Sequence, residues 1–145
     1  MPAETVAQHK LPLLICGCGR KGCYETLASG PGLERLAFHL LGRKISAHRL
    51  IFEKKAQPDL EKIWQIWCSV NAQLLRALIL TIDPHIIVLG GGLSTIEGLI
   101  PALEKHLARL QWDGLPIPVI KKASRGETAA ALGAAYQAWQ VAQNV

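Results

Sequence analysis

The sequence predicts an α/β fold that is rich in helix and carries a small sheet. Three observations lead to this prediction. Apolar residues recur every three or four positions over most of the chain beyond residue 30, which is typical of amphipathic helices. A β-branched apolar run at residues 86–89 ends in three glycines, and a second short apolar run occupies residues 117–120. With 145 residues, 50% of them apolar and 19% charged, the chain can bury the core of a single domain.

The N-terminal third is predicted to be a loop followed by two helices. Glycine and proline interrupt the first 30 residues repeatedly, so no long element is expected there. Ser29 is a suitable N-cap for a helix over residues 32–41, which should end at Gly42. A second helix is expected at about residues 46–54.

The longest helix is predicted to begin at Asp59, which follows Pro58 and is a good N-cap. Asp83-Pro84 should end this helix, because the residue before a proline disfavours helical dihedral angles. Cys68 lies on the apolar stripe of the helix and is expected to be a core residue. The stripe recurs at helical spacing in Leu60, Ile63, Trp64, Trp67, Leu74, Leu75, Leu78 and Ile82.

The apolar run at residues 86–89 is predicted to be a buried parallel strand that opens into a turn at Gly90, Gly91 and Gly92. Such continuous apolar runs are typical of strands covered on both faces. A helix should follow with Pro101 at its first position, where the missing N–H is not needed.

The last third is predicted to hold one more strand and one more helix. Residues 117–120 should lie at a sheet edge, because Pro118 cannot donate a hydrogen bond to a neighbouring strand. In the final helix, Leu132, Tyr136 and Trp139 share one face. Two strands make a poor sheet for a complete domain.

The sequence also indicates the cellular compartment in which we expect this chain. No uninterrupted apolar run approaches the roughly 18 residues of a membrane span, and Asp83-Pro84-His85 interrupts the longest candidate, between Leu78 and Leu93. The first residues lack the basic and apolar regions of a secretory signal. We therefore expect a cytoplasmic location without a membrane partner, where thiols stay reduced.

Positive charge is concentrated in the N-terminal third. Residues 1–55 carry the whole net charge of +5, and the rest of the chain balances to zero. Such a region could meet an anionic partner, but a solvated surface is the simpler interpretation. We find no helix-turn-helix pattern and no aromatic RNA-binding signature, so nucleic acid is not an expected partner.

The most specific motif is the sequence CGCGRKGC, in which Cys16, Cys18 and Cys23 lie on a glycine-rich loop. Three thiolates and one imidazole, His9, would complete a closed tetrahedral zinc site with a structural role. The alternatives are a reduced cluster without metal and a redox pair. Arg20 and its basic neighbours could offset the negative charge of such a site.

His9, the spacing of the three cysteines, Glu25 and Ser29-Gly30 together resemble the zinc-loop signature of the ROK family, which comprises bacterial sugar kinases and their repressor relatives. Downstream, the sequence DPHIIVLGGGLS at residues 83–94 and LGAA at residues 132–135 follow in the same order as in that family. The resemblance extends from His9 to about residue 138.

The resemblance implies the C-terminal lobe of an actin-like, ribonuclease H-like ATPase fold. In that frame residues 1–145 form a single lobe, with a zinc loop at 9–25, a helical region at 26–82 and a strand–helix–strand–helix region at 83–145. It implies ATP and Mg²⁺ as cofactors besides zinc, and transfer of the γ-phosphoryl group to a hexose or N-acetylhexosamine such as N-acetylglucosamine or N-acetylmannosamine. The chain resembles the ROK glucokinases as well.

Site residues also follow from the resemblance. His9 and Glu25 correspond to family residues that contact sugar hydroxyls, while Gly90, Gly91 and Gly92 correspond to a segment near the nucleotide. A carboxylate on a rigid metal loop is a suitable acceptor for sugar hydroxyls. The alternative for Glu25 is an acidic residue favoured by a helix N-terminus.

No catalytic residue is assigned, because the family's Asp-Gly-Gly-Thr phosphate loop and catalytic aspartate have no counterpart before His9. The sequence VAQH also stands where the family has Glu-x-Gly-His. We therefore expect the C-terminal part of a sugar kinase that is inactive alone and associates with itself or with an N-terminal lobe. The alternative is a zinc-stabilised sugar-sensing or interaction module related to the ROK repressors.

Overall fold

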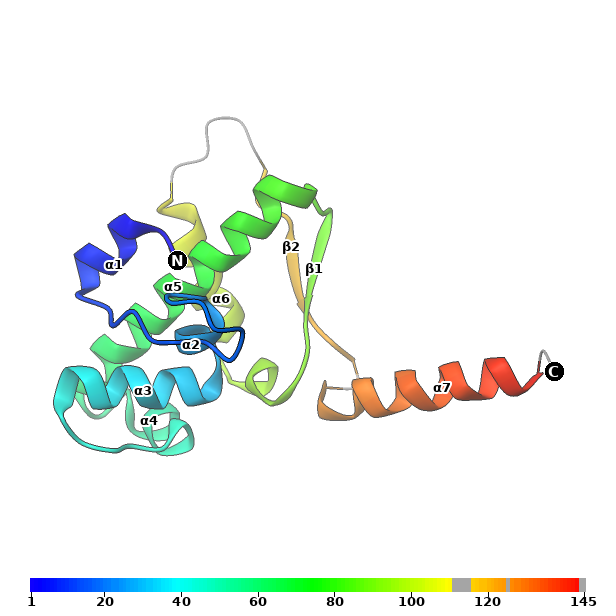
Figure 1. The fold of residues 1–145 in the computed structure, drawn as a ribbon, viewed down its shortest axis with the longest axis horizontal. Helices are drawn as coiled ribbons and strands as arrows, with labels where there is room; N and C mark the ends of the chain where they lie inside the picture. The colour runs from blue at the N-terminus through cyan, green and yellow to red at the C-terminus, as the bar shows by residue number, and fades with distance from the viewer. Residues whose placement is uncertain (111–115, 125, 144–145) are drawn as a thin grey trace.

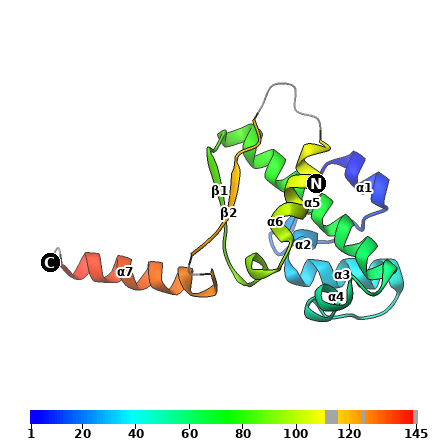
Figure 2. The same cartoon turned by 180° about the vertical axis from the view of Figure 1, so that it is seen from behind.

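A computed structural model describes residues 1–110, 116–124 and 126–143, and it has a helical body, a two-stranded sheet beside the body and a last helix that projects away (Figures 1 and 2). The helix-rich α/β class with a small sheet is therefore confirmed. In chain order the elements are α1 (Ala3–His9), α2 (Glu25–Ala28), α3 (Gly30–Leu41), α4 (Ala47–Glu53), α5 (Pro58–Ile82), β1 (Ile86–Leu89), η1 (Gly92–Thr95), α6 (Leu99–Ala108), β2 (Val119–Lys122), η2 (Gly126–Thr128) and α7 (Ala129–Gln143).

Helix α5 is the centre of the core and packs against α2, α3, α4 and α6. Trp67 is 2% exposed, stacks on Trp64 with ring centroids 5.2 Å apart, and donates its indole N–H to the Ser29 carbonyl oxygen at 3.2 Å. Cys68 is fully buried, as predicted. On the α6 side, His106 Nε2 lies 2.9 Å from Gln65 Oε1. The helix therefore joins the cysteine-bearing N-terminal segment to the C-terminal half.

Both ends of α5 are defined by backbone conformation. The predicted cap, Asp59, is wrong by two positions: Gln57 is the extended N-cap, and Pro58 is the first helical residue, where its missing N–H costs nothing. At the other end Asp83 adopts φ 49° and donates its N–H to the Ile79 carbonyl oxygen at 2.8 Å. The predicted stop at Asp83-Pro84 is therefore confirmed.

Helix α5 is long and apolar enough to cross a membrane by length and composition, although the sequence contains no uninterrupted apolar run of that length. Charged and polar residues such as Glu61, Lys62 and Arg76 divide its apolar residues, so no continuous run marks it in the sequence. Of its most apolar 18-residue window, 39% is buried inside this structure. Since core helices share these features, the composition is weak evidence for a span.

The junction of α2 and α3 depends on a close backbone approach. Ser29 Oγ accepts the Gly32 N–H at 3.2 Å, which is the predicted cap, and Gly42 ends α3 with φ 69°. The helix begins two residues earlier than predicted, because Gly30 and Pro31 form its first positions. A Cβ added to Gly32 would lie within 3.0 Å of backbone atoms of Leu27. Only glycine therefore fits where the two helices meet.

We expect Gly32→Ala to lower the free energy of unfolding by about 1–3 kcal/mol, because a backbone clash cannot be relieved by a side-chain rotation. Urea denaturation followed by circular dichroism measures this loss. Gly133→Ala in α7 is the matched control, because its Cβ would meet nothing within 4 Å. Equal unfolding midpoints for the two variants would contradict the proposed packing.

Helix α1 was not expected, since residues 1–30 were predicted to be loop-like. Residues 3–9 contain neither glycine nor proline, and the helix they form ends at Lys10, whose φ is 51°. Thr5 is 4% exposed, so the helix is seated on the body. His39 Nε2 lies 2.9 Å from the Lys10 carbonyl oxygen and joins α3 to this helix end. The frequent glycines and prolines begin only at residue 12, and the prediction extended them too far upstream.

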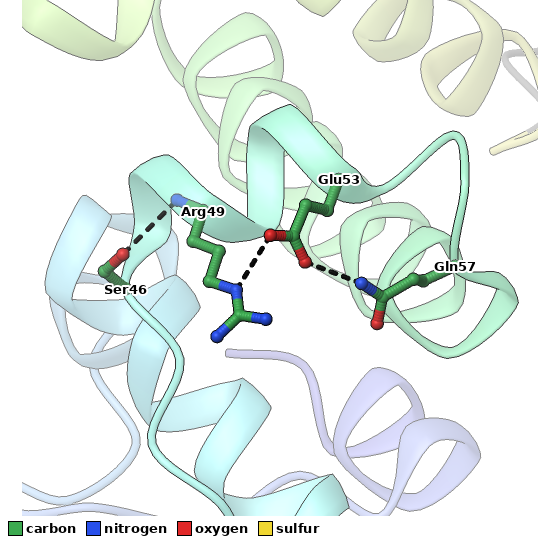
Figure 3. Close-up of polar contacts among 4 residues, drawn as sticks. All are labelled: Ser46, Arg49, Glu53 and Gln57. Atoms are coloured by element: carbon green, nitrogen blue, oxygen red, sulfur yellow. Dashed lines mark hydrogen bonds and ion pairs between the residues drawn. The ribbon is translucent and has the colours of Figure 1, made fainter.

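Helix α4 is a short helix that buries Leu50 and carries local polar contacts on its outer side (Figure 3). Ser46 Oγ accepts the Arg49 N–H at 3.3 Å and caps the helix. Glu53 accepts from Arg49 Nε at 2.8 Å through Oε1 and from Gln57 Nε2 at 2.6 Å through Oε2. Because the Arg49 side chain is 65% exposed, this ion pair contributes only about 0.3–0.5 kcal/mol. The helix predicted at residues 46–54 is confirmed.

Strands β1 and β2 are parallel and pair Ile86 with Val119 and Ile87 with Ile120. Ile120 is 5% exposed and faces the body, whereas Val88 on the opposite face of β1 is 61% exposed. The prediction of a parallel strand is confirmed, but the prediction that it is buried is wrong for one face. β2 begins two residues later than predicted, just past Pro118, which has no N–H to donate.

Helix α6 begins at Leu99 rather than at Pro101, with Gly98 as N-cap at φ 77°. Pro101 therefore occupies the third helical position, where the N–H has no intrahelical partner in any helix. Leu103 and Leu107 are buried and face the core.

Helix α7 projects from the end of the sheet and none of its described side chains is buried (Figures 1 and 2). Tyr136 and Trp139 stack with ring centroids 5.7 Å apart on the predicted apolar face, but each is more than half exposed. The helix sequence AAALGAAYQAWQVAQ contains no charged residue. It therefore presents an apolar face that the described part of the chain leaves uncovered.

Candidate metal centre and sugar site

The cysteine loop is a tight hairpin between α1 and α2. Ile15 and Lys21 form an antiparallel bridge, and Cys16 donates its N–H to the Arg20 carbonyl oxygen at 2.8 Å while accepting from the Gly19 N–H at 2.9 Å. Gly19 and Gly22 adopt φ of 82° and 75°, a region in which side chains are strained. The glycines therefore allow the chain to reverse twice within the motif.

This hairpin brings the three predicted thiols together. The Sγ atoms of Cys16, Cys18 and Cys23 all lie within 4.8 Å of one another, and those of Cys18 and Cys23 are 3.6 Å apart. Tetrahedral zinc with Zn–S bonds of about 2.3 Å needs sulfurs about 3.8 Å apart. Three soft thiolates at these separations fit such an ion. The cluster can thus hold a metal.

Thiol acidity differs within the cluster. A backbone hydrogen bond at Arg20, followed by the contacts with Cys23 and Cys16, lowers the pKa of the Cys18 thiol. The contact with Cys18 and loss of solvation raise the pKa of Cys23 to about 11. Burial raises the pKa of Cys68, far from the loop on α5, to about 12. The pKa shift thus favours the thiolate at Cys18 and the thiol at Cys23, and Cys68 is a packing residue.

The structure does not bring His9 into the cysteine group: among the described residues, the potential ligands that lie within 4.8 Å of one another are the three cysteines. Desolvation lowers the pKa of His9, and the charge of His9 is one of the influences that lower the pKa of His106 on α6. His9 thus sits at the end of α1 on the side of α6. The sequence spacing alone could not reveal this, because α1 was not foreseen.

Glu25 is exposed at the first position of α2, immediately after the cysteine loop. It lines an open cavity of about 770 Å³ together with Cys16, Lys21 and Arg35. Within the described residues, no hydrogen-bond partner holds its carboxylate, so its oxygens are available to a ligand. The cavity combines an acceptor, two cations and the apolar residues Leu13, Leu14 and Ile15, a composition that suits a small polar ligand.

Arg35 was missed by sequence reasoning. Its guanidinium donates to the Thr26 carbonyl oxygen at 3.0 Å, which holds it across the α2–α3 junction, and it lines the same cavity as Glu25. No motif marks this residue, and its position on the polar side of α3 was the only available signal.

The predicted glycine turn lies beyond the carboxyl end of β1. Gly91 adopts φ 78°, and Ser94 Oγ donates to its carbonyl oxygen at 2.7 Å as η1 begins. A Cβ on Gly30 would lie 3.7 Å from Leu93, so η1 is next to the start of α3. In α/β proteins, ligands bind outside the carboxyl ends of parallel strands. The turn is in a suitable place for a ligand, separate from the cysteine loop.

The fold and the cysteine loop define a member of the ROK family: residues 5–141 match that family, so the chain belongs to it. It is 36% identical over 134 residues to the N-acetylgalactosamine kinase AgaK of Shewanella sp. (strain ANA-3), covering 92% of this chain and 44% of that protein. It is 38% identical over 136 residues to the N-acetyl-D-glucosamine kinase of Mannheimia succiniciproducens, covering 91% and 44%.

Solved structures agree with this assignment. The ROK hexokinase of Thermus thermophilus superimposes with a TM-score of 0.74 at 33% identity, over 93% of this chain and 47% of that one. The ROK family glucokinase of Streptomyces griseus, in complex with glucose and AMPPNP, gives 0.72 at 26% identity, over 88% and 47%. The chain therefore spans about half the length of its relatives, corresponding to their C-terminal portion.

Proposed function

We propose that this chain is the C-terminal part of an ATP-dependent sugar kinase that phosphorylates an N-acetylhexosamine. The observation that carries the proposal is the family match over residues 5–141 in a chain whose cysteine cluster adjoins a cavity lined by Glu25. The relatives named above are kinases of N-acetylgalactosamine and N-acetyl-D-glucosamine, which supports this substrate class and favours a kinase over a sensing module.

In this proposal Cys16, Cys18 and Cys23 hold a structural zinc ion. When bound, the ion supplies a rigid centre that cross-links the hairpin. The chain's own contribution is to place Glu25, two residues after Cys23, at a fixed position on the cavity wall. His9 remains the fourth ligand predicted from the sequence, although its ring is outside the cysteine group in this structure.

Glu25 is proposed to accept hydrogen bonds from sugar hydroxyls, with Lys21 and Arg35 as donors on the same wall. A carboxylate can accept from two neighbouring hydroxyls at once, and such charge-assisted bonds are stronger than neutral ones. His9 is a second sugar contact in the prediction from the sequence. Gly90, Gly91 and Gly92 are proposed to lie near the nucleotide, since a turn without side chains lets phosphates approach the backbone.

Sugar binding tests this proposal. Titrating the zinc-loaded chain with N-acetyl-D-glucosamine and N-acetyl-D-galactosamine should shift NMR resonances of residues lining the cavity, and Glu25→Gln should weaken binding at least about tenfold, because hydrogen bonds to a charged group contribute about 1.5–3 kcal/mol. Glu4→Gln, an exposed acid on α1, is the matched control. Equal affinity in the two variants would remove Glu25 from the site.

The exposed apolar surface supports a partner for this chain. Apolar side chains that are 48–67% exposed lie at the end of α5, on one face of the sheet and along α7: Leu80, Ile82, Ile86, Val88, Val119, Leu132, Tyr136, Trp139 and Val141. Exposed apolar surface beyond scattered single residues is typical of interaction surfaces. We propose that in a full-length kinase the remaining half of the chain covers them.

The 145-residue chain alone should therefore self-associate. Sedimentation velocity should show dimers or larger species whose fraction rises with protein concentration. The double variant Tyr136→Glu with Trp139→Glu should shift the distribution towards monomer, because burying an unpaired charge in the interface is costly. A monodisperse monomer at all concentrations would contradict the prediction.

A further inference from the structure

We propose that Cys18 and Cys23 form a redox-modification site, in which a peroxide closes a disulfide between them and thereby dismantles the metal-binding triad. The inference goes beyond sugar phosphorylation and is independent of it. It starts from the 3.6 Å separation of the two Sγ atoms and from the exposure of Cys18 at the tip of the hairpin.

The pair is selected by geometry. A disulfide bond is about 2.0 Å long, so the Cys18 and Cys23 sulfurs must approach by only about 1.6 Å from their present contact. Gly19 and Gly22 lie between them, and the backbone can adjust most easily at glycine. Cys16 is held within the hairpin at both its N–H and its carbonyl, and Cys23 is held at its carbonyl by Thr26. The backbone of Cys18 is the freer partner, and its 3.6 Å contact with Cys23 makes this the pair that we expect to close.

Access also favours this pair. Cys18 is exposed and Cys23 is half-buried, whereas Cys68 has no exposed surface and lies on α5. An oxidant dissolved in water reaches Cys18 first. Cys68 is too buried to compete, and it provides an internal control in the same chain.

The chemistry balances with one peroxide molecule. The Cys18 sulfur attacks a peroxide oxygen; an S–O bond forms, the O–O bond breaks, and with hydrogen peroxide one water leaves, giving a sulfenic acid. The Cys23 sulfur then attacks the Cys18 sulfur; the S–S bond forms and the oxygen leaves as a second water with the thiol proton. Two thiols and one hydrogen peroxide yield one disulfide and two waters.

Formation of the disulfide should release the zinc ion, because it removes two of the cysteine ligands. A cysteine binds zinc as its thiolate, and the oxidised loop retains a single one, on Cys16. One sulfur, even together with the predicted ligand His9, leaves two of the four positions of a closed structural site without a protein ligand. Reduction of the disulfide restores all three ligands, so the site responds reversibly to the surrounding thiol and peroxide levels.

The experiment treats the whole chain, metal-free and zinc-loaded, with graded hydrogen peroxide. Trypsin separates residues 11–20, which hold Cys16 and Cys18, from residues 22–35, which hold Cys23. We expect a disulfide-linked pair of these peptides, fragmentation that places the bridge at Cys18, and release of one zinc per disulfide to a chromogenic chelator. Dithiothreitol with added zinc should reverse both changes.

Variants sharpen the test. Cys16→Ala and Cys68→Ala should still give the linked peptides, and Cys18→Ala should not. Fragmentation of the wild-type linked pair locates the bridge without any variant, so a poorly folded variant does not obscure the result. A Cys16–Cys18 bridge within one peptide, a bridge at Cys16, sulfinic acid without a disulfide, or a disulfide with zinc retained would each overturn the proposal.

Discussion

Chelation of the metal should lower the melting temperature of the zinc-loaded chain by at least about 10 °C. Structural zinc sites contribute on the order of 10 kcal/mol to folding, and each kcal/mol shifts the melting temperature by about 2–4 °C in a chain of this size. The loop lies between Leu11 and Leu27, which are 5% and 0% exposed, so its loss also loosens core residues on either side. Differential scanning calorimetry with and without a chelator measures the effect.

Substitutions separate the metal from other causes. Cys18→Ser should reproduce the effect of the chelator and should bind no zinc by elemental analysis. Cys68→Ala, which removes a buried thiol outside the loop, should keep full zinc content. His9→Ala in cobalt-substituted protein tests the predicted fourth ligand, because loss of an imidazole changes the visible absorption of the ion. An unchanged melt and no bound zinc in the wild type would remove the metal site.

The second large effect concerns catalysis: the 145-residue chain, supplied with ATP, Mg²⁺ and zinc, should phosphorylate no N-acetylhexosamine above a no-protein control. Phosphoryl transfer requires a base for the sugar hydroxyl, a loop around the phosphates and ligands for Mg²⁺. The chain spans 44% of its Shewanella relative, and its sequence contains no Asp-Gly-Gly-Thr loop. Sugar-dependent ADP formation, followed by a coupled assay, checks this.

A full-length N-acetyl-D-glucosamine kinase is the positive control under the same conditions. Sugar-dependent turnover by the chain alone would mean that its own residues supply the base and the phosphate contacts. In that event the proposal of a partial kinase fails, while the metal site and the redox pair remain open to their own tests.

Local signals predicted most of the helices. Ser29, Gly42 and Asp83 mark helix ends through capping and left-handed backbone geometry, and these rules depend only on neighbouring residues. Burial was harder to predict. Val88 and Tyr136 lie at positions whose apolar pattern is typical of a core, but both are exposed. An apolar pattern indicates that a face is to be covered; it does not indicate whether the covering element belongs to the described chain.

The candidate site likewise has one part that local sequence predicts and another part that depends on packing. The cysteine cluster was predicted in full, because three ligands on one short hairpin are brought together by local geometry. Arg35 and His9 depend on how α1, α2 and α3 pack, and that packing is not encoded in residue spacing. Arg35 lines the same cavity as Glu25 and is held there by its bond to the Thr26 carbonyl oxygen. Long-range contacts thus account for the unpredicted part of the site.

A chimera tests the central claim, that this chain is the C-terminal part of a ROK N-acetylhexosamine kinase, most directly. Residues 5–141 replace the matching segment of the Shewanella N-acetylgalactosamine kinase, and sugar-dependent ADP formation is measured after circular dichroism and zinc analysis show a folded, metal-loaded protein. We predict phosphorylation of an N-acetylhexosamine that Glu25→Gln strongly reduces. A folded, zinc-loaded chimera that forms no ADP with any N-acetylhexosamine would contradict the account.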